Sequence, residues 1–306
     1  MLSEIEMIAK EFLLDCEIRG LSVKTIKNRK FEIGKFLDFL YTAGVKEISG
    51  VNRMVIKQYL AFKSSQNLSR SSIRAFYFCV SSFITFCEKE RYLPKNIMEG
   101  LEPPKIEQRQ VNALTYEEVI KLLNSYTTQS FKQLRGKTAI ALLADTGVRS
   151  NELLNIKLDH IQQDSIFIEK AKGNKQRTVY LSALSTQILS KYLRRRQDYF
   201  TDHALIDEEY LFVSSTVGRQ LTYAGLYQII KFAEKKAGLK DVRPHKFRHF
   251  YAVQSLSNGL DLFFVQRVLG HKSVSTTAKV YLGSMQEAEV KRNAKLNSPL
   301  LKRNKK

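Results

Sequence analysis

The chain has 306 residues, a formal charge of +20 at pH 7 and a pI near 9.8. A basic excess of this size indicates a polyanionic partner, with nucleic acid as the first candidate and charge that serves only solubility as the alternative. The length favours two domains, the 43% apolar content is sufficient for two cores, and no apolar run approaches the ~20 residues of a membrane span.

Cysteine usage and the N-terminal residues predict a cytoplasmic protein. Cys16, Cys79 and Cys87 lack the spacing of metal-binding pairs and are odd in number, so reduced thiols are expected. The N-terminus alternates acidic and apolar residues and lacks the basic start and apolar stretch of a signal peptide. Such a basic protein is expected to associate with the nucleoid and not with a membrane.

An all-helical domain is predicted for residues 1–101. A helix that begins at the cap residue Ser22 carries Lys24 and Lys27 on a basic outer face, where they are candidates for nucleic-acid contacts. Its apolar stripe comprises Ile26, Ile33, Phe36, Leu37 and Leu40. A second long helix stops before Pro94, and its aromatic stripe is interpreted as core and not as a base-stacking surface.

Residues 102–110 are predicted to form an interdomain linker, because two adjacent prolines disfavour helix and most of the other residues are polar. Thr115 and Glu118 then have the spacing of a capping box, which opens a new helical region. The second domain is therefore expected to comprise residues 111–306.

The second domain is predicted to contain one small antiparallel sheet among helices. Two β-branched and aromatic runs, 165–171 and 177–181, flank a glycine-containing turn and are expected to form a hairpin. A further short strand is predicted at 210–213, and the rest of the chain after residue 181 is mostly helical. The expected fold class is mainly α with a small antiparallel β-sheet, in a two-domain chain.

Residues 146–153 have the sequence TGVRSNEL, which puts Arg149 at a helix start, just after a glycine that can end the preceding helix. A guanidinium donates paired hydrogen bonds to phosphate oxygens and keeps its charge, so Arg149 suits a phosphorus transition state. A surface arginine that pairs with Glu152, three residues later, is the alternative interpretation.

Residues 244–249 have the sequence PHKFRH, which predicts a helix that begins at Pro244. His245, Arg248 and His249 then share one face, which is cationic or donates hydrogen bonds throughout, as a phosphate requires. Two histidines four residues apart can also bind zinc, but no carboxylate lies between them and no further ligand group follows, so no metal is expected. A histidine packed in the core is a further alternative for His249.

Residues 269–278 have the sequence LGHKSVSTTA, and Tyr281 follows them. The Leu-Gly pair predicts a helix end, which puts His271 on a turn where its side chain can enter a cleft. A structural tyrosine is the alternative for Tyr281, since the chain has 14 tyrosines.

In chain order, this arginine, the His-x-x-Arg group, the histidine and the tyrosine resemble the active-site signature of the tyrosine recombinase (integrase) family, with compact Xer-like members as the nearest type. The resemblance covers nearly the whole chain. The catalytic group that it implies comprises Arg149, Lys172, His245, Arg248, His271 and Tyr281. Tyr281 would attack a scissile phosphate of DNA to give a 3′-phosphotyrosyl link and a free 5′ hydroxyl.

The resemblance also implies the catalytic roles of the other groups. Arg149, Arg248 and His271 would stabilise the phosphorane charge, while His245 would take the tyrosine proton or bind a phosphate oxygen. Glu152 would support the arginine, and the second histidine of the His-x-x-Arg-His group, His249, would act less directly. The ester conserves the bond energy, so no metal, nucleotide or other cofactor is expected.

A lysine on the hairpin turn is the family's general acid toward the leaving 5′ oxygen. The family's run Gly-Lys-Gly-x-Lys-x-Arg compares with AKGNKQR at residues 171–177, which points to Lys172, with Lys175 as the second candidate. Lys175 and Arg177 are otherwise expected to contact the DNA backbone. A solvated basic turn is the alternative for all three residues.

The implied activity is site-specific recombination, in which DNA strands are cleaved and rejoined through a Holliday junction. The implied partner is double-stranded DNA with paired inverted half-sites, bound by a homotetramer on two sites or by a heterotetramer with a related recombinase. A weakly apolar helix at 285–296 is expected to dock on a neighbouring subunit, or else to pack on its own domain. A type IB topoisomerase and a catalytically inactive DNA-binding regulator are the alternatives.

Overall fold

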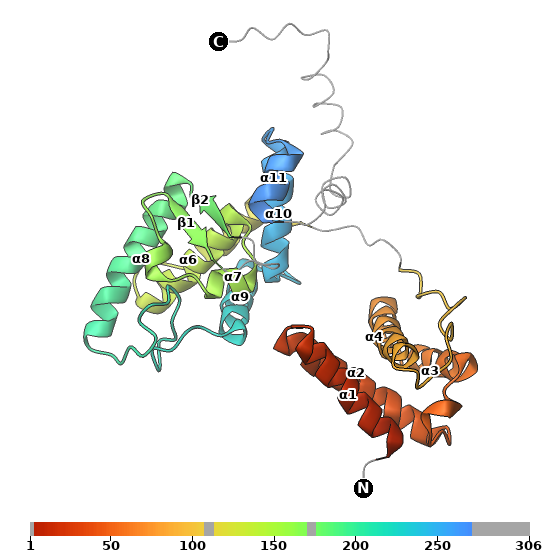
Figure 1. Ribbon diagram of the computed structural model, residues 1–306. Helices are drawn as coiled ribbons and strands as arrows, with labels where there is room; N and C mark the ends of the chain where they lie inside the picture. The colour runs from red at the N-terminus through yellow and green to blue at the C-terminus, as the bar shows by residue number, and fades with distance from the viewer. Residues whose placement is uncertain (1–2, 107–112, 170–175, 271–306) are drawn as a thin grey trace, which may run out of the picture. The chain divides into compact units, whose positions relative to one another are not determined.

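The computed structural model describes residues 3–106, 113–169 and 176–270, and the chain divides into two compact units, Met1–Gln108 and Arg109–Lys306 (Figure 1). We call these unit 1 and unit 2. Each unit has its own cluster of buried hydrophobic side chains. Among the helices of the described ranges, none combines the length and apolar character of a membrane span.

Unit 1 is helical. Its elements are α1 (Glu4–Ile18), α2 (Val23–Thr42), the 3-10 helix η1 (Ile48–Gly50), α3 (Arg53–Ser65) and α4 (Arg70–Lys89). Each α-helix begins at a side chain that accepts a hydrogen bond from the first turn, and these caps are Ser3, Ser22, Asn52 and Ser69. The N-terminal ends of these helices are therefore fixed by local sequence.

The aromatic stripe of α4 is confirmed as core. Seven residues that recur at helical spacing along this stripe are buried: Ile73, Phe76, Tyr77, Val80, Phe83, Ile84 and Cys87. Phe83 meets Phe12 of α1 in an edge-to-face contact, with 5.4 Å between the ring centroids. On α2, the stripe residues at 33, 36 and 40 are buried, while Lys24 and Lys27 are exposed on the opposite side.

Unit 2 contains seven α-helices in its described residues, together with a 3-10 helix and two strands. They are α5 (Tyr116–Asn124), α6 (Phe131–Thr146), α7 (Ser150–Leu154), η2 (Leu158–His160), β1 (Ser165–Ile168), β2 (Arg177–Tyr180), α8 (Ala183–Thr201), α9 (Tyr223–Ala237), α10 (Pro244–Ser257) and α11 (Leu262–Leu269). Helix α6 is buried around most of its circumference and packs against α8 and α10 (Figure 1). Its C-terminal end therefore lies among other elements and not at the surface.

The predicted hairpin is confirmed as an antiparallel pair, with Ser165 opposite Tyr180 and Ile168 opposite Arg177. Its turn, 170–175, lies outside the described residues. The fold is mainly α with a small antiparallel sheet, as predicted.

The further strand predicted at 210–213 is wrong, because Tyr210 and Val213 form only isolated bridges, to Lys157 and Gln220. The apolar residues of this run are fully buried in a connecting segment, so their hydrophobicity reflects burial and not sheet pairing.

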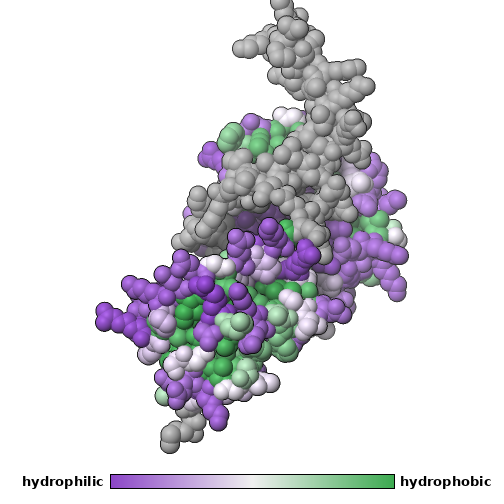
Figure 2. All heavy atoms as spheres, turned by 90° about the vertical axis from the view of Figure 1, so that its right-hand side faces the viewer, coloured by the Kyte–Doolittle hydropathy of each residue, from purple (hydrophilic) through white to green (hydrophobic). Residues whose placement is uncertain are grey.

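Hydrophobic side chains reach the surface among hydrophilic ones, as Figure 2 illustrates for one face. In unit 1 the exposed aromatic residues include Phe31, Phe62 and Phe78. The ammonium group of Lys35 lies 4.0 Å from the ring centroid of Phe31. Exposed apolar residues of this kind are ordinary on a protein surface, so by themselves they mark no site.

Candidate active site

The candidate site is built where two helix ends meet in unit 2. Helix α6 ends at Gly147 with a φ of 62°, and α11 ends at Gly270 with a φ of 64°, so both caps adopt the left-handed conformation that favours glycine. A Cβ atom at Gly147 would lie 2.7 Å from Cδ2 of Leu269 and 2.9 Å from the ring of Tyr251. The absence of a side chain at Gly147 therefore allows the two turns to pack directly on each other.

Arg149 follows the first of these turns as the N-cap residue of α7. Its backbone N–H donates to Oε2 of Glu152 at 2.9 Å, and its Nη1 donates to Oε1 of the same carboxylate at 2.7 Å. Its Nη2 donates to the carbonyl of Gly270 at 3.2 Å. The pair suggested by the sequence is present, but its carboxylate is only 2% exposed, so Glu152 orients Arg149 from within the protein.

Glu152 has a second arginine partner that the sequence did not reveal. Arg177, the first residue of β2, donates from Nη1 and Nη2 to the two carboxylate oxygens at 3.2 and 2.7 Å. Burial alone would raise the pKa of Glu152, but the hydrogen bonds from Arg177 and then from Arg149 hold it below 4.5. Glu152 is therefore ionised at neutral pH. The predicted contact of Arg177 with the DNA backbone stays a prediction, and its side chain is 10% exposed.

Arg248 joins the two turns from α10. Its Nη1 donates to the carbonyl of Gly147 at 2.8 Å, and its Nη2 donates to the carbonyl of Leu269. The residue is 3% exposed. Burial, and after it the positive charge of Arg149, lowers the pKa of Arg248 from 12.5 to about 9. Arg248 thus remains a cation at neutral pH.

The two histidines of the site lie one turn apart on α10, which begins at Pro244 as predicted. Their rings meet edge to face with 4.5 Å between centroids. Desolvation, and then the charges of Arg248 and Arg149, lowers the pKa of His245 below 6.5. Burial, and then the charge of His245, lowers the pKa of His249 to about 4. Both rings are therefore neutral at pH 7, and His245, which reaches solvent, can accept a proton.

No metal-binding cluster of three His, Cys, Asp or Glu side chains occurs in the described ranges. His245 and His249 have arginines as their charged neighbours, and positive charge opposes cation binding. The zinc alternative therefore lacks a third ligand in this part of the chain.

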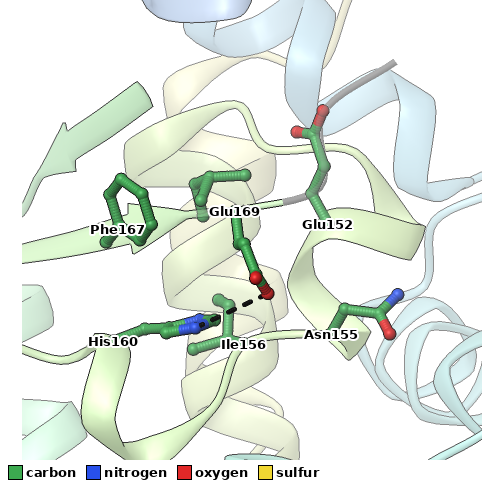
Figure 3. Close-up of a pocket in the computed structure, with 7 residues that line it drawn as sticks. Glu152, Asn155, Ile156, His160, Phe167 and Glu169 are labelled. Carbon is green, nitrogen blue, oxygen red and sulfur yellow. Dashed lines mark ion pairs between the residues drawn. The ribbon is translucent and has the colours of Figure 1, made fainter. Parts of the chain in front are cut away.

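A small pocket lies beside Glu152, and Figure 3 shows His160 pointing toward Glu169 across it. Nε2 of His160 lies 3.9 Å from Oε2 of Glu169, and its Nδ1 accepts from the backbone N–H of Lys157 at 3.3 Å. The ring of Phe167 packs edge to face on the imidazole, with centroids 5.8 Å apart. His160 thus ties η2 to the end of β1. No sequence motif had singled it out.

The structure brings together six of the residues selected from the sequence: Arg149, Glu152, Arg177, His245, Arg248 and His249. Four others, Lys172, Lys175, His271 and Tyr281, lie outside the described residues, as does the predicted helix at 285–296.

Comparison with known proteins identifies the family. Residues 112–287, more than half of the chain, match the model of the phage integrase family. The chain belongs to this family. One relative is the tyrosine recombinase XerD of Staphylococcus haemolyticus (strain JCSC1435), 31% identical over 276 residues that cover 89% of this chain and 92% of the relative. Another is XerD of Listeria monocytogenes serotype 4b (strain F2365), 31% identical over 268 residues, which cover 85% of this chain and 88% of that protein.

Solved structures of tyrosine recombinases share the fold. The XerA recombinase is 27% identical, with a TM-score of 0.54, and the match covers 97% of this chain and 100% of that one. XerH in a post-cleavage complex with a palindromic difH substrate is 22% identical, with a TM-score of 0.74, over 93% of this chain and 84% of XerH. The family model and the XerD relatives confirm the family resemblance inferred from the motifs.

Proposed function

We propose that this tyrosine recombinase cleaves and rejoins DNA at specific sites through a covalent link between Tyr281 and a 3′ phosphate. The observation that carries the proposal is the pair of turns at Gly147 and Gly270, where Arg149 and Arg248 are held by backbone carbonyls. Two cations fixed in advance stabilise developing phosphate charge without the cost of reorganisation. The membership in the phage integrase family supports the same chemistry.

The two arginines would bind the non-bridging oxygens of the scissile phosphate. Arg248 uses one N–H of Nη1 and one of Nη2 for the carbonyls, and each of these nitrogens carries a second N–H. Arg149 is 27% exposed and so remains accessible to DNA. His271 is the next residue after Gly270, whose carbonyl accepts from Arg149, and we assign it to the same phosphate.

Cleavage would proceed in one displacement. The Tyr281 oxygen forms a bond to phosphorus while the bond from phosphorus to the 5′ oxygen breaks, and the electron pair leaves with that oxygen. Neutral His245 receives the tyrosine proton or hydrogen-bonds a phosphate oxygen, and Lys172 gives a proton to the leaving oxygen. Rejoining is the reverse reaction, with a 5′ hydroxyl from the partner strand as nucleophile.

We propose further that the protein acts as a tetramer on two sites with paired inverted half-sites, composed of this chain alone or of this chain with a related recombinase. A lambda integrase tetramer bound to a Holliday junction is 17% identical to this chain with a TM-score of 0.73, which supports the fold for such an assembly. Unit 1 would contact DNA through Lys24 and Lys27, and unit 2 through Lys175 and its active site.

Covalent capture from genomic DNA tests this function. The full chain is incubated with sheared DNA of its own genome, the reaction is stopped with detergent, and DNA linked to protein is recovered and sequenced. We expect one set of related sites with two inverted half-sites of ~11 base pairs, each about one helical turn long. Covalent DNA of unrelated sequences would favour a topoisomerase, and tight binding without any covalent DNA would favour an inactive regulator.

A further inference from the structure

The buried carboxylate of Glu152 accepts three hydrogen bonds from guanidinium groups and one from a backbone N–H. Both of its oxygens accept from Arg149 and from Arg177 at 2.7 to 3.2 Å, and its side chain is 2% exposed. A buried carboxylate so close to Arg149 has two opposite effects. It orients the guanidinium, but its negative charge also weakens the attraction of that guanidinium for a phosphate.

Arg177 compensates the negative charge of Glu152, which would otherwise weaken the attraction of Arg149 for a phosphate. Arg149 and Glu152 alone form a neutral pair, whereas Arg177 contributes one further positive charge, so that the three side chains together carry a charge of +1. The compensation is strong because Arg177 is itself only 10% exposed and binds the carboxylate through both terminal nitrogens. Water therefore screens this interaction less than it would an exposed ion pair.

Arg177 also lies next to three elements of the site, namely β1, α7 and the turn at Gly270. It is paired with Ile168 across the β1–β2 sheet, and a Cβ atom at Gly270 would lie 3.4 Å from its Nη1. Nη1 of Arg149 lies 3.9 Å from the same point. Both guanidinium groups thus pack under the turn that precedes residue 271, and Arg177 ties β2 to α7 at that point.

We propose that Arg177 is a positioning residue of the active site, which neutralises Glu152 so that Arg149 is oriented by this carboxylate and still presents a positive charge to the scissile phosphate. The inference rests on the proposed strand-cleavage function. It differs from the role expected from the sequence, in which Arg177 contacts the DNA backbone. The two roles make opposite predictions for DNA binding.

The test measures binding and cleavage separately with a nicked duplex that contains the site recovered by covalent capture. We expect Arg177→Gln to keep DNA affinity within about twofold and to leave the slope of log affinity against log salt unchanged. A backbone contact would instead reduce that slope by about one. Covalent complex formation should fall by about 10- to 100-fold, the scale typical when a residue that orients an active-site group is lost. Arg19→Gln removes an exposed arginine paired with Asp15 and is the matched control, with unchanged cleavage.

Charge compensation is tested most directly by a double variant. In Arg177→Gln with Glu152→Gln, the amide oxygen at 152 still accepts from Arg149 but no longer cancels its charge, so cleavage should recover at least about tenfold relative to the single Arg177 variant. A purely structural role of the ion pair predicts further loss instead. Arg177→Lys, which keeps the charge, should cleave within about tenfold of the wild type even if Arg177→Gln fails to fold.

Several outcomes would overturn the inference. They are wild-type cleavage by a folded Arg177→Gln variant, a double variant no faster than the single one, or an Arg177→Lys variant that binds DNA but does not cleave it. A wild-type chain that forms no covalent complex at all would instead remove the proposed function, and this inference with it.

Discussion

Replacement of Gly147 by alanine tests the packing that brings the two turns of the site together. Gly238, the cap of α9, offers a matched control, because both glycines end a helix of unit 2 with a positive φ, 62° and 67°. A Cβ atom at Gly147 would lie 2.7 Å from Leu269, whereas one at Gly238 would meet nothing within 4 Å. The two substitutions thus share the backbone strain and differ in the steric conflict.

The expected losses of stability follow from the backbone strain and the steric conflict. The left-handed conformation costs an alanine about 1–2 kcal/mol relative to glycine, and this cost applies to both variants. Overpacking against the fully buried Leu269 adds about 1–3 kcal/mol for Gly147→Ala alone. For a unit of this size, that difference lowers the melting temperature of Gly147→Ala by roughly 2–12 °C more than that of Gly238→Ala.

Differential scanning calorimetry of the full chain measures both variants against the wild type. We expect Gly147→Ala to lower the unfolding temperature of unit 2 more than Gly238→Ala does and to reduce strand cleavage, since the Gly147 carbonyl accepts from Arg248. Equal melting temperatures for the two variants would refute the direct packing of the α6 turn on the end of α11.

Three further predictions concern protonation, leaving-group chemistry and charge. The pKa of His249 is about 4 in the folded protein and 6.5 without burial, so the free energy of unfolding should fall as the pH drops from 6.5 to 4. Urea titrations of His249→Gln should lack this loss of stability at low pH. A pH profile of stability equal to that of the wild type would contradict the prediction. Lys172→Ala should cleave ordinary DNA slowly but should cleave DNA with a 5′-bridging sulfur at close to the wild-type rate, because a thiolate leaves without an acid. If the sulfur substrate restores cleavage by Lys175→Ala and not by Lys172→Ala, Lys175 is the general acid. Log affinity for DNA should decrease steeply with log salt, since the chain carries a net charge of +20, and a slope near zero would argue against nucleic acid as the main partner.

The features that could be predicted from sequence depend on residues close together in the chain. Ser22, Thr115 and Pro244 begin helices as predicted, because a capping side chain or a proline acts within one turn. The pair of Arg149 and Glu152, three residues apart, was recognised for the same reason.

The other contacts of the site join residues that are distant in sequence, and these contacts were not predicted. Arg177 lies 25 residues from Glu152, and Arg248 lies 101 residues from the Gly147 carbonyl, so only tertiary packing brings these groups together. The strand prediction for residues 210–213 was wrong for a related reason, since an apolar run is equally compatible with a strand and with a buried connection. The sequence thus indicated the Arg149–Glu152 pair, but not that Arg177 binds Glu152 or that the Gly147 carbonyl holds Arg248.

The most direct test of the proposed mechanism is to identify the residue that becomes linked to DNA. After covalent capture, the protein is digested with trypsin and nuclease, and peptides that carry a residual nucleotide are sequenced by mass spectrometry. We expect the modification on Tyr281 and its complete loss in Tyr281→Phe, which should still bind DNA with wild-type affinity. A nucleotide on another tyrosine, with Tyr251 beside Gly147 the first to examine, or an adduct that persists in Tyr281→Phe, would contradict the proposed mechanism.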